Sequence, residues 1–141
     1  MSLRRLMAFL IDTSVWGRDN QPEIQVRLQE LNRADSIWTC RAVDLETVYN
    51  ARSRDAANHV YRRRLMLDVP ITTAIMDRSL DVAVEMAETG LHRHAKPMDL
   101  IIAAAAESVE LTILHYDSDF DHIASVTGQS TEWIAHPGSL D

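Results

Sequence analysis

Acidic residues stand directly after two apolar stretches of this sequence. Asp12 follows the run Leu6–Ile11, and Asp117 follows the run Leu111–Tyr116. Aspartate also caps helices and starts turns, so neither residue alone is good evidence for function. If both runs are parallel strands of one sheet, the two carboxylates lie at the same sheet edge, where open α/β proteins bind their ligands.

Two further acids are predicted to point toward the core from helices. Glu46 and Asp99 each fall into an apolar stripe at helical spacing. The stripe partners are Ala42, Leu45 and Tyr49 for Glu46, and Ile102, Ala103 and Ala106 for Asp99. Asp99 could instead be a favourable acid at a helix N-terminus, worth about 0.3–1 kcal/mol, and Glu46 could reach water from the margin of its stripe. The convergence of all four acids on one sheet edge favours a functional site.

Four converging carboxylates require a cation among them. Two unit charges about 4 Å apart repel by roughly 4 kcal/mol at an effective dielectric constant near 20. A ligand set made only of oxygens favours Mg²⁺ or Mn²⁺ over zinc. Such an ion lowers the pKa of water and neutralises charge on a transferring phosphoryl group. The sequence therefore predicts metal-assisted phosphodiester hydrolysis, which needs no Ser, Cys or His nucleophile.

Alternating apolar runs and helical periods indicate the elements that position these acids. Strands are expected over Leu6–Ile11, Ile37–Cys40, Leu111–Tyr116 and, at an edge, residues 130–135. Helices are expected over residues 22–31, 42–50, 55–67, 76–87, from Pro97 onward, and over 118–127 before Gly128. The stripe Met76, Leu80, Ala83, Val84 and Ala87 is expected to face the core. Strands separated by helices predict a three-layer α/β/α sandwich with a mainly parallel central sheet, as one domain spanning residues 1–141.

Composition narrows the class of protein. The 141 residues are 46% hydrophobic and 25% charged, which is typical of a globular domain. No apolar run is long enough to cross a bilayer, so we expect a cytoplasmic protein without membrane contact. The net charge of -7 argues against nucleic-acid binding by bulk electrostatics. A local arginine cluster is either an RNA-guiding patch or a solvated helix face. Its members are Arg52, Arg54, Arg62, Arg63 and Arg64.

Four motifs in order resemble those of the PIN-domain ribonucleases, and within that group of VapC-like toxins from type II toxin–antitoxin systems. They are FLIDTSVW, Glu46 after the second strand, KPMDLIIAAAA and LHYDSDFDHIA, and they cover nearly the whole chain. The resemblance implies an Mg²⁺- or Mn²⁺-dependent endoribonuclease that cleaves structured RNA, such as tRNA or rRNA, by metal-activated water. It also implies a cognate VapB-like antitoxin and a homodimer.

The same resemblance assigns roles to individual residues. The matching catalytic acids are Asp12, Glu46, Asp99 and Asp117, and Asp119 is a fifth metal ligand. Glu46 would also orient the attacking water, and Ser14 would support Asp12 by hydrogen bonding. His115 stands where relatives more often carry Thr, which leaves the surroundings of Asp117 open.

Two other functions fit parts of the pattern. A phosphatase of the haloacid dehalogenase type also begins with an acid after its first strand, but it requires a second Asp two residues later, where this chain has Ser14. A catalytically inactive PIN domain that only binds RNA or protein would keep its affinity in a chelator. His122, beside the last acids, is a weaker candidate for contact with the site.

Overall fold

A five-stranded sheet, parallel throughout, forms the centre of the computed structural model, which describes residues 8–34 and 37–141. Its strands are β1 (Phe9–Ile11), β2 (Ile37–Cys40), β3 (Leu67–Val69), β4 (Thr112–His115) and β5 (Thr131–Trp133). They lie in the order β3-β2-β1-β4-β5, and all four neighbouring pairs are parallel. The predicted α/β/α fold class is confirmed.

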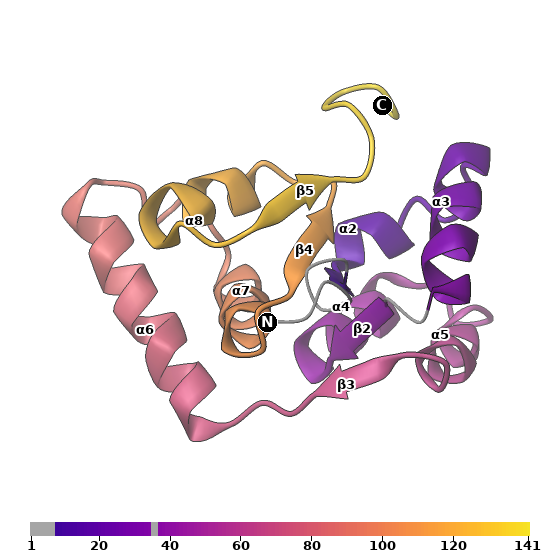
Figure 1. Cartoon of the computed structure of the whole chain (residues 1–141), viewed down its shortest axis with the longest axis horizontal. Coiled ribbons are helices and arrows are strands. Elements are labelled where there is room, and N and C mark those ends of the chain that lie inside the picture. Colours follow the sequence, from indigo (N-terminus) through magenta and orange to yellow (C-terminus); the bar gives the residue numbers. More distant parts are fainter. Residues whose placement is uncertain (1–7, 35–36) are drawn as a thin grey trace.

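Helices cover both faces of this sheet. They are α2 (Thr13–Trp16), α3 (Pro22–Arg33), α4 (Arg41–Asn50), α5 (Ala56–Arg63), α6 (Thr73–Glu88), α7 (Pro97–Ser108) and α8 (Asp119–Thr127). In Figure 1, α6, α7 and α8 lie to the left of the sheet and α3 and α5 to its right. The core joins the buried strands to the alanine-rich face of α7. No helix in the described part of the chain is long and apolar enough to span a membrane.

The strand order reverses at β1. The chain builds β2 and β3 on one side of β1, then returns through α6 and α7 to place β4 on the other side. The register pairs Ile11 with Leu114, and the Asp12 amide donates to the Leu114 carbonyl at 3.0 Å. The carboxyl ends of β1 and β4 therefore flank the switch point, where open α/β sheets bind ligands.

Two element boundaries differ from the prediction. The helix expected over residues 55–67 ends at Arg63, and Leu67–Val69 instead forms the edge strand β3, paired with β2. A three-residue strand is too short to show a period of its own, so its partner in the sheet decides its conformation. The first strand begins at Phe9, and the predicted part at Leu6 lies outside the described residues.

The predicted apolar faces of α4 and α6 were wrong. In α4, Leu45 and Tyr49 are 65% and 88% exposed, whereas Asp44 is buried. In α6 the buried face is Ile75, Ser79, Val82 and Met86, and the predicted stripe residues Met76, Leu80 and Val84 face outward. Both faces of α6 carry apolar side chains at helical spacing. The one polar residue of the buried face, Ser79, donates hydrogen bonds from its hydroxyl to the carbonyls of Ile75 and Leu100. Packing against α7 selects between the two faces.

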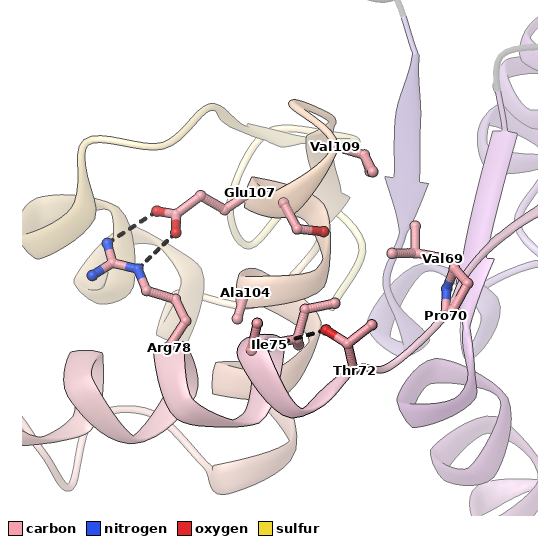
Figure 2. A pocket seen from close by; sticks show the side chains of 10 residues that line it. Val69, Pro70, Thr72, Ile75, Arg78, Ala104, Glu107 and Val109 are labelled. Atoms are coloured by element: carbon pink, nitrogen blue, oxygen red, sulfur yellow. Dashed lines mark hydrogen bonds and ion pairs between the residues drawn. The ribbon is translucent and has the colours of Figure 1, made fainter.

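A pocket of about 420 Å³ opens between the end of β3, the start of α6 and the C-terminal half of α7 (Figure 2). Its lining is mostly apolar and includes Val69, Ile75 and Ala104. At its rim, Arg78 donates from Nε and Nη2 to the two carboxylate oxygens of Glu107 at 2.7 and 3.1 Å. Glu107 lies eight residues, or about 12 Å along the helix, from Asp99, so this pocket is remote from the carboxylate cluster.

Candidate metal centre

Asp12 directly follows β1 and caps the short helix α2. Its Oδ2 accepts hydrogen bonds from the Ser14 amide at 3.0 Å and the Ser14 hydroxyl at 2.6 Å. The Ser14 hydroxyl in turn accepts from the Tyr116 amide at 2.9 Å, which links the ends of β1 and β4. Asp12 Oδ1 is buried and has no hydrogen-bond partner. One oxygen of this carboxylate is thus fixed, and the other is available to a ligand.

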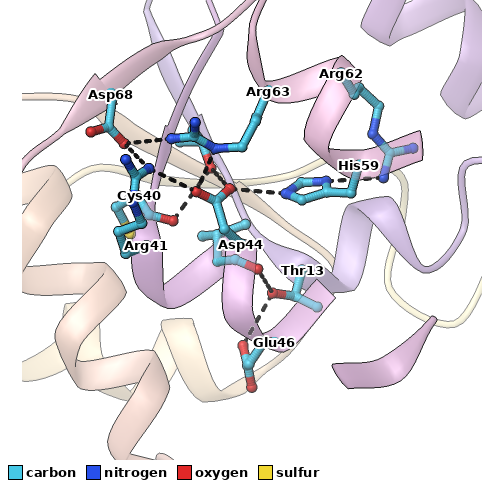
Figure 3. A network of polar contacts seen from close by, with 11 residues as sticks. Thr13, Cys40, Arg41, Asp44, Glu46, His59, Arg62, Arg63 and Asp68 are labelled. Carbon is cyan, nitrogen blue, oxygen red and sulfur yellow. Dashed lines mark hydrogen bonds and ion pairs between the residues drawn. The ribbon is translucent and has the colours of Figure 1, made fainter. Parts of the chain in front are cut away.

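Glu46 approaches Asp12 from α4. Its carboxylate accepts a hydrogen bond from the Thr13 hydroxyl at 3.1 Å, so the residue after Asp12 also orients Glu46 (Figure 3). Glu46 is half-buried, although Leu45 and Tyr49 of its predicted stripe are exposed. The stripe was wrong as a packing face, but Glu46 still points toward the other acids. Sequence reasoning missed the role of Thr13, whose position in the DTS motif was its only signal.

The remaining acids come from α7, the end of β4 and the start of α8. Asp99 lies in the first turn of α7 on a buried face, and its Oδ2 accepts from the Lys96 amide at 3.4 Å. Asp117 Oδ1 accepts from the Asp119 amide at 3.0 Å, which places Asp119 over the same edge of the sheet. The face predicted for Asp99 agrees with the burial of Ile102, Ala103 and Ala106.

These acids form two overlapping groups that could each hold a cation. One oxygen from each of Asp12, Glu46 and Asp99 lies within 4.8 Å of the others, and the same holds for Asp99, Asp117 and Asp119. Asp99 belongs to both groups. All the candidate ligands are carboxylate oxygens, which suit Mg²⁺ or Mn²⁺. Together with the unpartnered Asp12 oxygen, they fit a hard divalent ion.

Without a bound cation, two carboxyl groups of the site have raised pKa values. Burial raises the pKa of Asp12 to about 6, against the hydrogen bonds from Ser14 and with help from the Glu46 charge. Burial also raises the pKa of Asp99 to about 8, helped by its hydrogen bond to Asp119 and by the charge of Asp12. Burial acts against ionisation of Asp119 too, but hydrogen bonds from Asp99 and Lys96 outweigh it and lower the Asp119 pKa. An Asp99 proton thus bridges two carboxylates at neutral pH.

Lys96 is a cation that sequence reasoning gave no role. Its Nζ lies 2.8 Å from Asp119 Oδ2, 3.5 Å from Asp117 Oδ2 and 3.6 Å from Asp99 Oδ2. The hydrogen bond to Asp119 is the main reason that the Lys96 pKa is raised. The available signal was composition, since Lys96 is the only lysine in the chain.

A third buried acid, Asp44, belongs to a separate network (Figure 3). Its carboxylate accepts from Thr39 at 2.8 Å and Arg63 Nε at 2.8 Å, and lies 2.9 Å from His59 Nε2. Arg41 also contacts it, at 3.2 Å. These partners come from β2, α4 and α5, so Asp44 joins three elements and is fully compensated. No pattern in the sequence indicated that Asp44, one turn before Val48, was the buried acid of α4.

The five arginines of the predicted RNA-guiding cluster have different surroundings. Arg63 pairs with Asp44, while Arg62 pairs with Asp19 and lies 4.2 Å above the Trp16 ring. Arg52, Arg54 and Arg64 are exposed, and Arg52 pairs with the nearby Asp55. RNA guidance stays a prediction for all five. Arg62 and Arg63 have a structural role in addition.

His115 fixes the turn that carries Asp117. Its ring is fully buried, and Nδ1 accepts from the Asp117 amide at 3.1 Å. Burial lowers its pKa to about 4, so the ring is neutral near pH 7. Phe120 and Trp133 pack against it with ring centroids 5.1 and 5.0 Å away. His122 instead contacts the His94 ring at 5.0 Å.

Comparisons with family models and with curated proteins agree with the resemblance found in the sequence motifs. The family model of the PIN domain matches residues 9–126. Ribonuclease VapC18 of Mycobacterium tuberculosis is 38% identical over 137 residues, covering 95% of this chain and all of the relative. Ribonuclease VapC51 of the same organism is 34% identical over 135 residues, covering 96% and 98% of the two chains.

Solved structures share the fold. A chain of DNA-bound VapBC from Salmonella typhimurium superposes with a TM-score of 0.75 at 19% identity, covering 92% of this chain and all of that one. A chain of VapBC-5 from Mycobacterium tuberculosis gives a TM-score of 0.59 at 25% identity, covering 90% and 97%.

Proposed function

Since this chain belongs to the PIN domain family, we propose that it is a VapC-type toxin, a metal-dependent endoribonuclease built as one domain over residues 1–141. The family resemblance read from the motifs is confirmed. The observation that carries the proposed activity is the convergence of Asp12, Glu46 and Asp99 around one unpartnered buried oxygen. Structured RNA, such as tRNA or rRNA, is the proposed substrate.

In this proposal the chain holds Mg²⁺ or Mn²⁺ through Asp12, Asp99 and Glu46, with Asp117 and Asp119 on the neighbouring side. When bound, such an ion supplies a Lewis acid that lowers the pKa of water and neutralises phosphoryl charge. Asp12 is fixed by Ser14, and Asp99 by the first turn of α7, so neither must reorganise on binding. Asp99 releases its proton when it becomes a ligand.

Glu46 is the acid best placed to orient the attacking water. It is less buried than Asp12 and Asp99, and Thr13 holds one of its oxygens while the carboxylate stays accessible. Hydrolysis by water leaves a 5′-phosphate and a 3′-hydroxyl, whereas attack by the ribose 2′-hydroxyl leaves a cyclic phosphate. The product ends therefore report which nucleophile acts.

The test is cleavage of total cellular RNA by purified, antitoxin-free protein and its Asp99→Asn variant. Each is incubated with Mg²⁺, Mn²⁺ or chelator, and the new 5′ ends are mapped. Discrete 5′-phosphate ends that need both the ion and Asp99 would support the nuclease and identify its target. Folded protein that binds RNA equally in chelator and cuts nothing would instead favour an inactive binding module.

An antitoxin and a second copy of the chain are the proposed protein partners. Several large apolar side chains are exposed, among them Leu45, Tyr49, Leu65 and Leu80. A pocket of about 470 Å³ between α3 and α5 is lined in part by Trp16 and by Leu65. Burial of such surface would stabilise association. Light scattering of the toxin alone, and then with its cognate antitoxin, measures both assemblies.

A further inference from the structure

The carboxylate cluster contains room for two cations, and the chain itself supplies one of them. The two acidic groups share Asp99 but differ in their surroundings. Asp12 and Glu46 contact no lysine or arginine within residues 8–34 and 37–141. Asp99, Asp117 and Asp119 surround the Lys96 ammonium at 2.8–3.6 Å. The Asp12–Glu46 side of the cluster thus has no cationic partner among the described residues, whereas the Asp99–Asp117–Asp119 group is paired with the Lys96 ammonium.

The position of Lys96 is built into the fold. It is the N-cap of α7, directly before Pro97, with an extended backbone at φ -72° and ψ 152°. Its amide donates to Asp99, so the start of the side chain is fixed on the same carboxylate that its ammonium approaches. Apart from the 6 histidines, every other basic side chain in the sequence is arginine. A lysine ammonium is a compact point charge with three donors, and it can replace a small cation among three carboxylates better than a planar guanidinium can.

We propose that Lys96 acts as the second cation of the centre, so that the protein binds a single divalent ion between Asp12, Glu46 and Asp99. The Lys96 ammonium fills the Asp99–Asp117–Asp119 group and excludes an ion from it by charge repulsion. The Lys96 side chain is 64% exposed, so the ammonium also faces solvent, where an RNA phosphate would approach. This inference rests on the proposed function and defines its metal stoichiometry.

The test is to count Mn²⁺ ions bound per chain, by titration calorimetry and by the electron paramagnetic resonance signal of free Mn²⁺. Four full-length proteins are compared: wild type, Lys96→Met, Lys96→Arg and Arg27→Met. Arg27→Met is the matched control, because it removes one positive charge at an exposed pair with Glu132, away from the acids. We expect one ion for wild type, Lys96→Arg and Arg27→Met, and two for Lys96→Met.

The single lysine offers a second route that does not depend on refolding a variant. Acetylation of the folded wild-type chain with an N-hydroxysuccinimide ester neutralises Lys96 and otherwise only the N-terminal amine. The Lys96→Arg protein treated in the same way controls for the N-terminus. Acetylated wild type is expected to bind two ions and acetylated Lys96→Arg one, with mass spectrometry verifying the modification.

Two ions in the unmodified wild type, or one ion after the Lys96 charge is removed by either route, would overturn the proposal. If none of the four proteins bound an ion, the proposal of a metal centre would be refuted, together with the role of Lys96 in it. RNA cleavage gives a separate readout. Below saturation, the rate should rise with the first power of Mn²⁺ concentration in wild type and with the second power in Lys96→Met.

Discussion

Replacing Asp99 with Asn should stabilise the metal-free protein and destabilise the metal-loaded one. Asp99 is a buried residue, 3% exposed, and the pKa of its carboxyl is raised from 3.8 to about 8. The folded chain therefore binds more protons than the unfolded chain between about pH 4 and pH 8, so its unfolding free energy falls as the pH rises through that window. At about 1.4 kcal/mol per pKa unit, the cost at pH 8 is at most on the order of 5 kcal/mol.

Asn removes this cost but also weakens the hydrogen bonds of Asp99 with Asp119 and with the Lys96 amide, each worth about 1 kcal/mol. We expect a net gain of roughly 2–3 kcal/mol at pH 8 in chelator, or about 5–10 °C in melting temperature. At pH 4 most of the gain should be lost, because that pH lies close to the ordinary pKa of 3.8, where the unfolded carboxyl is also partly protonated.

Saturating Mg²⁺ should reverse the order. An ion at 1,000 times its dissociation constant stabilises wild type by about 4.1 kcal/mol, which exceeds the gain of the variant in chelator, and the variant lacks the ligand shared by both acidic groups. Differential scanning calorimetry at pH 4 and pH 8, with chelator or Mg²⁺, measures all four conditions. Asp81→Asn, at an exposed acid of α6, controls for net charge. Equal destabilisation by Asp99→Asn in all conditions would show that Asp99 is only a helix cap and refute the reasoning.

Substitutions at four further residues separate structural, positioning and RNA-binding roles. Asp44→Ala should lower the unfolding free energy by about 3–5 kcal/mol in urea denaturation, equally with and without Mg²⁺, because it leaves buried charges unpaired. His115→Ala should weaken Mn²⁺ binding measured by calorimetry, and His115→Asn should restore it by keeping an acceptor for the Asp117 amide; equal affinities would contradict this role. Arg52→Ala and Arg54→Ala should each weaken RNA binding and reduce its log–log salt dependence by about one, as measured by filter binding over a salt series.

The features that the sequence predicted well were those fixed by local order along the chain. The buried strands that precede Asp12 and Asp117 pair in parallel, and Asp99 follows Pro97 by two residues at a helix start. These relations depend on the order of elements along the chain, so they hold even where the buried face of a helix is predicted wrongly. The α/β/α class and the family followed from them.

The features that the sequence missed depend on which of two acceptable faces a helix buries. In α4, Asp44 has four partners from β2, α4 and α5, and two of them, His59 and Arg63, lie 15 and 19 residues away in the sequence, too far to give a periodic signal. In α6 both faces were apolar, and the neighbour α7 decided the outcome. Lys96 was missed for the same reason, since its partners Asp117 and Asp119 lie more than twenty residues away.

Burial alone does not distinguish a functional acid from a structural one; the charge of its partners does. Asp44 and Asp12 are both buried, but Asp44 has two arginines and a histidine, whereas Asp12 has only neutral Ser14 donors and one oxygen without a partner. A carboxylate that folding leaves uncompensated is costly unless a ligand restores the balance. By this criterion the proposed ion site begins at Asp12 and reaches only as far as Asp99, and in our proposal the Lys96 ammonium compensates the remaining charge.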